Sequence, residues 1–228
     1  MHFLVCVVLL LGVVAGADHS ESECEYSVVM ACRQSSNSAN VACNASMGGI
    51  QNVQTDLQRF VHFLLGSSLD YQLLAAGFNS FENNQPGFKK VFLELADHAW
   101  SKGIEVVKYI TKRGGKVDFR NVDGRKKMGR VLELDALHAL SLALDTEKQL
   151  LTTAHHIHRL ASRHDNHMHY DPSIAHFIEE RFLNHQPEII RKVSGYVNDM
   201  AQLARNAEPS LAFYLFDEHL KSQSRKLF

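Results

Sequence analysis

Apolar residues recur at helical spacing along most of the chain after residue 50. Steps of three and four positions place such residues on one face of an α-helix. The first stripe predicts a helix that ends in the asparagine-rich turn at 79–86, and it consists of Leu57, Val61, Leu64, Ser68, Tyr71, Ala75 and Phe78. The second predicts a helix that ends at Arg113-Gly114-Gly115, where glycine favours a left-handed C-cap, and it consists of Phe88, Phe92, Leu95, Ala99, Val106 and Ile110.

Two more stripes follow a long connection that contains several glycines. One predicts a helix before the turn at Asp171-Pro172 and consists of Leu132, Ala136, Ala139, Ala143, Glu147, Leu150, Ala154 and Ile157. The other predicts a helix from about Ser173 and consists of Ile174, Ile178, Phe182, Ile189, Val193, Val197 and Met200. A short apolar segment, Leu211–Leu220, follows Pro209. Short turns make neighbouring helices antiparallel, whereas the long connection can cross a whole bundle. The pattern therefore predicts an all-α four-helix bundle with one long crossover and a short fifth helix.

The composition is that of a soluble globular chain. Its 228 residues are 45% hydrophobic and 21% charged, with a formal net charge of −1. Because no basic excess exists to attract phosphate backbones, nucleic acid is not an expected partner. Three of the four prolines precede predicted helices. The fourth, Pro187, falls inside a helix and predicts a kink beside Gln186, since it cannot donate to the Leu183 carbonyl.

The first 17 residues have the pattern of a secretory signal peptide. A short apolar run ends in Ala15-Gly16-Ala17, a small-x-small cleavage site. The alternative is a retained membrane anchor, which the lack of a Lys/Arg cluster after the run disfavours. We expect a signal peptide at 1–17, a cysteine-containing extension at 18–50 and a helical domain at 51–228. The mature chain would pass through the ER and Golgi to the extracellular fluid, without a membrane association.

The extension carries three cysteines, an odd number in an oxidising compartment. We favour an internal bridge between Cys24 and Cys43, which leaves Cys32 in a Ser/Asn-rich loop. The remaining thiol could be buried, free or joined to another chain, and the sequence does not decide the pairing. Asn44-Ala45-Ser46 is a sequon for N-glycosylation at Asn44.

From Leu57 to about Leu220 the chain resembles ferritin subunits. The stretches that carry the resemblance are Lys112-Arg113-Gly114-Gly115, Glu147-Lys148, Leu160-Ala161, Asp171-Pro172, Phe177-Ile178-Glu179, Phe182-Leu183-Asn184-His185-Gln186 and Tyr214-Leu215-Phe216-Asp217-Glu218-His219. With its leader and cysteine-bearing extension, the chain is similar to the secreted ferritins of insects, whose shells combine heavy-chain and light-chain homologues. The resemblance implies a ferritin-like, diiron-type bundle at 51–228.

Oxidation of Fe(II) in such a bundle needs carboxylates and a histidine on facing helices, usually as Glu-x-x-His, because i and i+3 share one face. No glutamate of this chain has a histidine three positions later. The resemblance implies that the family's site survives only at Tyr71, Glu147 and Gln186, and it is lost at Leu64, Ala99 and Lys102. We therefore expect no catalytic ferroxidase site. We hypothesise that Lys102 pairs with Glu147 in place of metal; the alternative is that Lys102 extends to the surface.

Other side chains could still contact iron. The resemblance implies mineral nucleation at Glu94, Asp97 and His98, and a threefold channel lined by His176 and Glu179. A histidine-rich stretch offers pairs at i and i+3 that could share a transition-metal ion, namely His155, His158, His164 and His167. The alternatives are an exposed polar helix end or a pH sensor.

The resemblance thus implies a light-chain-type subunit without ferroxidase activity. Such a subunit supports mineral nucleation and assembly of a 24-subunit shell beside a heavy-chain-type partner. The cargo is iron, transported as Fe2+ and stored as a ferric (Fe3+) oxyhydroxide mineral. One alternative is a secreted subunit that is itself ferroxidase-competent. Another is a secreted four-helix signalling protein, which would be a small soluble species instead of a shell.

Overall fold

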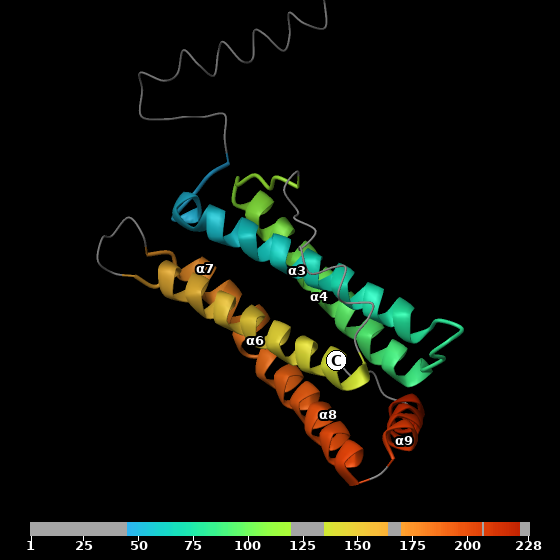
Figure 1. Ribbon diagram of the computed structural model, residues 1–228. Coiled ribbons are helices and arrows are strands. Elements are labelled where there is room, and N and C mark those ends of the chain that lie inside the picture. Colours follow the sequence, from blue (N-terminus) through green and yellow to red (C-terminus); the bar gives the residue numbers. More distant parts are fainter. Residues whose placement is uncertain (1–44, 120–134, 164–169, 207, 224–228) are drawn as a thin grey trace, which may run out of the picture. The chain divides into compact units, whose positions relative to one another are not determined.

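The computed structural model describes residues 45–119, 135–163, 170–206 and 208–223 (Figure 1). These residues form helices and connections only, and the helices belong to one compact unit, residues 46–228. The elements in chain order are α3 (Ile50–Phe78), α4 (Pro86–Lys112), α6 (Ala136–Ala161), α7 (Pro172–Ile178), the π-helix η2 (Glu179–Leu183), α8 (Gln186–Asn206) and α9 (Pro209–Ser222). The predicted all-α bundle with a long crossover and a short fifth helix is confirmed.

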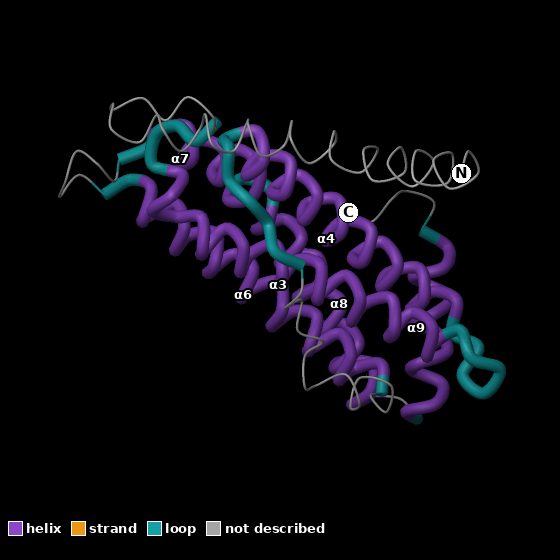
Figure 2. The backbone as a smooth tube through the Cα atoms, turned by 90° about the horizontal axis from the view of Figure 1, so that it is seen from above, coloured by secondary structure: helices purple, strands orange, loops and turns teal. Residues whose placement is uncertain are grey.

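The first two helices pack against each other along their length (Figure 2). Helix α3 begins at Ile50, seven residues before the first member of the predicted stripe, because buried Ile50 and Val53 continue the same apolar face. Helix α4 ends at Lys112, and Gly114 follows it with a φ of 76°. The left-handed glycine predicted after the second helix is therefore present.

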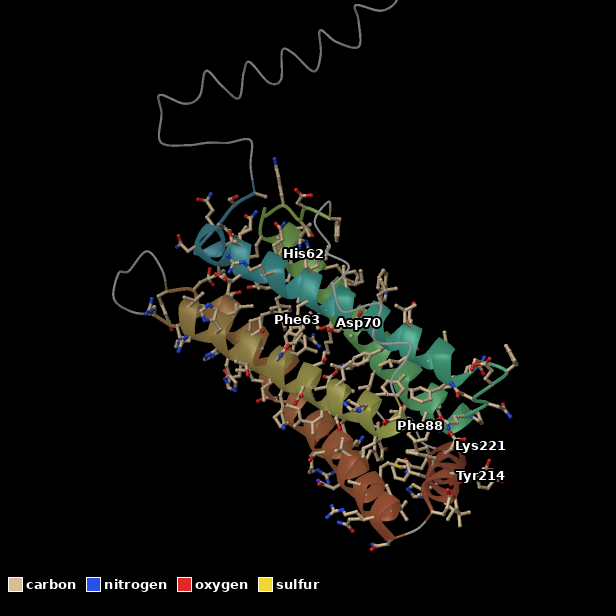
Figure 3. The ribbon with its side chains drawn as sticks, in the orientation of Figure 1. His62, Phe63, Asp70, Phe88, Tyr214 and Lys221 are labelled. Carbon is tan, nitrogen blue, oxygen red and sulfur yellow. The ribbon has the colours of Figure 1, made fainter. Side chains whose placement is uncertain are left out.

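The long connection between α4 and α6 starts along the surface of α3. Gln54 donates to the Lys116 carbonyl at 3.2 Å, and Gln58 donates to the Asp118 carbonyl at 3.3 Å. His62, labelled in Figure 3, lies one turn further along and contacts the same Asp118 oxygen at 2.7 Å. Three polar side chains on successive turns of α3 thus hold residues 116–118, at the start of the connection, against this helix.

Aspartate side chains cap the helices that follow the crossover. Asp135 accepts from the backbone N–H of His138 at 2.8 Å and caps α6. Asp171 accepts from the N–H groups of Ser173 and Ile174 and caps α7. Both fit the usual preference for aspartate at the N-cap. Leu132, a predicted member of the third stripe, lies outside the described residues.

The predicted fourth helix is interrupted. After α7, the chain widens into η2, where Asn184 N–H donates to the Glu179 carbonyl, five residues back, at 3.1 Å. Helix α8 then begins at Gln186, so Pro187 lies in a first helical turn, where its missing N–H costs no helical bond. The kink predicted beside Gln186 takes the form of a break into separate helical segments.

Two apolar clusters form the core, one toward each end of the bundle. In the first, the Phe78 ring stacks on Phe88 and Phe92 with centroids 5.3 Å away in both cases. Helix α9 closes this end, since the Phe88 and Phe216 ring centroids lie 5.8 Å apart. The second cluster contains Leu64 and Leu150. Glu147, one turn before Leu150, lies where the two clusters meet.

Candidate functional site

Three buried polar side chains meet at the centre of the bundle. Tyr71 comes from α3, Glu147 from α6 and Gln186 from the start of α8, and their exposed fractions are 2%, 2% and 5%. We refer to these three residues as the polar centre. They are the residues that the family resemblance assigned to one surviving site, and the structure brings them together.

The two carboxyl oxygens of Glu147 are both engaged in hydrogen bonds. The Tyr71 hydroxyl lies 2.6 Å from Oε1, and the Gln186 amide nitrogen donates to Oε2. Gln186 also lies 3.4 Å from the Glu147 carbonyl oxygen, and Tyr71 lies 3.4 Å from the Ala143 carbonyl oxygen. The carboxyl group is therefore held in one orientation by groups from two other helices.

Burial raises the pKa of Glu147 above its ordinary value, although the hydrogen bonds from Tyr71 and Gln186 oppose this shift. Desolvation disfavours the charged form, and no ion-pair partner for Glu147 exists among the residues that the structure describes. The neutral acid also suits the Tyr71 hydroxyl, which has one hydrogen but two oxygens within reach. A protonated Glu147 can donate to Tyr71, which leaves the tyrosine hydrogen for the Ala143 carbonyl.

The predicted ion pair between Lys102 and Glu147 is wrong. Within the described part of the chain, the Lys102 ammonium pairs with Glu105, with Nζ 3.4 Å from Oε2, and it also lies 5.7 Å from the centroid of the Phe182 ring. The lysine side chain is 14% exposed, so its stem is covered while the ammonium reaches a partially hydrated partner. Full burial beside Glu147 would have removed that hydration.

Leu64 and Ala99, where the resemblance implies lost ligands, are apolar residues. Leu64 is 3% exposed and Ala99 is 2% exposed. They offer no oxygen or nitrogen to a cation. Among the residues that the structure describes, Glu147 is therefore the one carboxyl group at the centre of the bundle, and its two oxygens alone do not complete the coordination of two metal ions.

The proposed nucleation residues on α4 differ in exposure and in their charged neighbours. Asp97 is exposed, whereas His98 is half-buried. The pKa of His98 is lowered from 6.5 to about 4, mainly by burial and also by the charge of Lys102, against the opposing effect of Glu105. His98 is therefore a neutral imidazole at physiological pH. Glu94 acts instead on Tyr196, whose pKa is raised by burial and by the glutamate charge.

The other candidate ligands are paired separately. His176 Nε2 lies 3.8 Å from Glu180, while Glu179 lies 4.0 Å from His158. His155 is exposed, and His164 and His167 lie outside the described residues, as do Cys24, Cys32, Cys43 and Asn44. Among the described side chains, no group of three or more His, Cys, Asp or Glu residues is placed to hold a metal ion.

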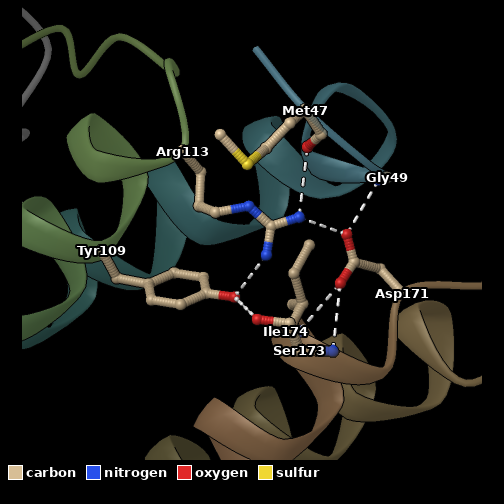
Figure 4. Close-up of polar contacts among 7 residues, drawn as sticks. All are labelled: Met47, Gly49, Tyr109, Arg113, Asp171, Ser173 and Ile174. Carbon is tan, nitrogen blue, oxygen red and sulfur yellow. Dashed lines mark hydrogen bonds and ion pairs between the residues drawn. The ribbon is translucent and has the colours of Figure 1, made fainter. Parts of the chain in front are cut away.

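One polar network was missed from the sequence, and it holds the start of α3 (Figure 4). Arg113, just after α4, pairs with Asp171, the cap of α7, and also donates to the Met47 carbonyl at 3.1 Å. Asp171 accepts from the N–H of Gly49 at 2.8 Å. An aspartate before Pro172 predicts a helix N-cap, so the role of Asp171 as a cap could have been found from the sequence. Its pairing with Arg113, 58 residues earlier, could not.

Comparison with known proteins places this arrangement in a family. The model of the ferritin-like domain matches residues 54–203. The chain belongs to the ferritin family. It is 44% identical to the ferritin light chain of Drosophila melanogaster, over 98% of this chain and 100% of that protein. It is 39% identical to the ferritin light chain of Trichoplusia ni, over 97% and 99% of the two chains.

The fold of this ferritin also matches a solved structure. The crystal structure of Trichoplusia ni secreted ferritin aligns with a TM-score of 0.69 and 37% identity, covering 88% of this chain and 98% of that one. The resemblance inferred from the motifs is thereby confirmed. The chain is an iron-storage subunit of the ferritin family, whose members form multi-subunit shells. None of its described helices is both long enough and apolar enough to span a bilayer.

Proposed function

We propose that this ferritin chain is a light-chain-type subunit that stores iron without oxidising it. The observation that carries the proposal is the chemistry of the polar centre. Its one carboxyl group, Glu147, has a raised pKa and both oxygens hydrogen-bonded to Tyr71 and Gln186. Diiron centres in such bundles use glutamates from several helices together with Glu-x-x-His motifs. A single buried carboxyl group that is held by Tyr71 and Gln186 does not meet that requirement.

The relatives support the same role. Two ferritins that align with nearly the whole chain carry the name light chain. The proposed subunit acts in a secreted shell beside a heavy-chain-type partner that oxidises Fe(II). Its own contribution is to the shell wall and to the ferric mineral, with Glu94 and Asp97 offering carboxylates from α4, while His176 and Glu179 each contribute to a channel.

The decisive experiment measures Fe(II) oxidation by shells assembled from this chain alone. We expect slow oxidation, at the rate of iron in protein-free buffer. The matched variant combines Leu64→Glu, Ala99→Glu and Lys102→His, which restores the missing ligand types around Glu147 and should accelerate oxidation. Adding Glu147→Gln to that variant should abolish the gain. Fast oxidation by the unmodified chain would contradict the proposal and favour the ferroxidase-competent alternative.

The heavy-chain-type partner has a separate test. We propose that Cys24 and Cys43 form an internal disulfide and that Cys32 joins the partner. On a non-reducing gel of the secreted protein, Cys32→Ser should abolish a disulfide-linked species of two chains. Asn44→Gln should leave that species linked and lower its mass only by the mass of the glycan. If the linked species persists in the Cys32→Ser variant, another cysteine makes the bond. Gel filtration separates a shell from the small species expected of a signalling protein.

A further inference from the structure

The surface between α3 and α6 carries a polar groove of about 620 Å³. Asp56 and Arg59 line it from α3, and the side chains that line it from α6 are Thr152, Thr153, His155, His156, His158 and Arg159. We refer to it as the α3–α6 groove. It lies away from the polar centre, toward the start of α3 and the end of α6.

Positive charge predominates in the groove. Two guanidinium groups face one carboxylate, Asp56, which Arg59 contacts at 3.0 Å. Arg59 remains 72% exposed, so most of its five N–H donors are still available. Arg159 donates to Nδ1 of His156 at 3.2 Å and likewise keeps further donors. The groove therefore presents two guanidinium groups, of which Arg59 is partly neutralised by Asp56.

The histidines add donors of the same kind. Because Arg159 donates to Nδ1 of His156, the neutral ring carries its hydrogen on Nε2, which lies 4.0 Å from Asp56. His155 is exposed on the groove wall. His158 is the exception, since its Nε2 lies 4.0 Å from Glu179 of η2 and is directed toward that carboxylate. The groups available to a ligand are thus mainly N–H donors.

This donor set selects an oxyanion. Guanidinium forks match phosphate oxygens bidentately and bind them with charge-assisted hydrogen bonds. A metal cation is disfavoured, because the groove has a positive excess and no three His, Cys, Asp or Glu side chains in the described chain are placed to hold one. Its volume falls in the range of sites for small organic ligands. We propose that the α3–α6 groove binds a small anion that carries several phosphate groups.

The test uses the intact, assembled protein after removal of metals by chelator and dialysis, with inorganic tripolyphosphate as the probe in isothermal titration calorimetry. We expect saturable binding, and weaker binding of orthophosphate. Arg59→Gln and Arg159→Gln should each weaken tripolyphosphate binding about tenfold, the effect of losing one charge-assisted contact. The matched control is Arg205→Gln on α8, an exposed arginine outside the groove, which should leave binding unchanged.

Asp56→Asn separates an anion site from a cation site. Removing the one carboxylate of the groove should strengthen tripolyphosphate binding, whereas it would weaken the binding of a metal. Titration with zinc alone provides the second comparison. The proposal is overturned if both arginine variants bind like the Arg205→Gln control, or if zinc binds in the groove and Asp56→Asn abolishes that binding. Equal affinity for orthophosphate would overturn the assignment of a ligand with several phosphate groups.

Discussion

Arg113 and Asp171 form an ion pair that joins the end of α4 to the start of α7, with Nη2 of the arginine 2.5 Å from Oδ2 of the aspartate. The side chains are 11% and 6% exposed, so solvent screens the pair only weakly. Gly49 donates to the same carboxylate from the residue before α3. The pair therefore connects three helix ends at one end of the bundle.

Asp171→Asn should destabilise the protein by about 3 kcal/mol, because it leaves the guanidinium of Arg113 buried without its counter-charge. Although burial raises the pKa of Asp171, hydrogen bonds from Arg113, Gly49 and Ile174 outweigh it, and the net pKa is lowered. A lowered folded-state pKa contributes stability above the unfolded-state pKa, which is lost as pH falls through the folded-state value. The difference between wild type and variant should therefore shrink in acid.

Denaturant unfolding of both proteins at neutral pH and in acid measures this difference. Asp199→Asn is the matched control, since Asp199 is exposed on α8 and its replacement should change stability by less than about 0.5 kcal/mol. If the two variants unfold at the same denaturant concentration, the ion pair does not stabilise the bundle.

Most of the fold could be predicted from the sequence because its helices are long and strongly periodic. The stripes located α3, α4 and α6, and proline positions marked the starts of α4, α7 and α9. The errors lie at boundaries and at the π-helix η2. The i→i+5 hydrogen bonds of a π-helix leave no periodic pattern of apolar residues in a five-residue segment. Only Pro187 indicated that the fourth helix would be interrupted.

The candidate site was harder to predict where the outcome depended on side-chain direction. Tyr71, Glu147 and Gln186 meet because helical spacing places each on an inward face. The direction of Lys102 could not be deduced in this way, since a four-carbon stem from one backbone position reaches either Glu105 or the core. The partners of Arg113 lie on other elements, and their pairing depends on helix register, which periodicity does not determine.

Gly48→Ala should destabilise the protein, because Gly48 has a φ of 61° and no room for a side chain. A Cβ there would lie 2.5 Å from Asp171 Oδ2 and 2.6 Å from Arg113 Nη2. Both the left-handed backbone and the ion pair would be disturbed, so we expect a loss of at least about 1 kcal/mol. Thermal unfolding by circular dichroism measures the loss.

Gly195→Ala provides a matched control, because the same substitution should raise the stability of the protein at this position. Gly195 lies inside α8, and a Cβ added there meets no atom within 4 Å. Alanine is favoured over glycine in a helix interior, so this variant should gain up to about 1 kcal/mol. If Gly48→Ala and Gly195→Ala shift the midpoint equally, the backbone at Gly48 imposes no special requirement.

Asp217 of α9 caps α4 from outside. The N-cap residue of α4, Gln85, makes no side-chain cap, and Asp217 Oδ1 instead accepts from the N–H of Phe88 at 2.9 Å. Asp217→Ala should cost about 1 kcal/mol and loosen α9, as loss of a cap usually does. Asp217→Asn keeps an accepting oxygen and should cost much less. Amide hydrogen exchange at Phe88 and thermal unfolding check both variants.

The control for the cap is Glu218→Ala, which removes a partly exposed carboxylate that pairs with Lys221 at 2.9 Å. Such a surface pair contributes little, so its loss should leave Phe88 protected from exchange. Equal exchange rates at Phe88 in the Asp217→Ala and Glu218→Ala variants would contradict the capping role of Asp217.

Glu147→Gln tests whether the polar centre holds a neutral acid. Burial raises the pKa of Glu147 despite the bonds from Tyr71 and Gln186. A raised folded-state pKa gives stability that is fully present below the unfolded-state pKa and is lost as pH rises through the folded-state value. Glutamine retains the shape and an accepting oxygen without a titrating proton. The variant should therefore be as stable as wild type near pH 4 and more stable at pH 8.

Unfolding midpoints measured from pH 4 to pH 8 show directly whether the variant gains or loses stability relative to wild type as pH rises. We expect the variant's advantage to grow with pH, because only the wild-type protein must keep a buried carboxyl group protonated or accept its charge. Glu188→Gln is the matched control, since Glu188 is exposed in the first turn of α8 and should show no such growth. A wild-type protein that is more stable than Glu147→Gln at pH 8 would mean that Glu147 is charged in the folded bundle. The polar centre would then retain an anionic ligand for a cation, and the proposal that this subunit does not oxidise iron would lose its main support.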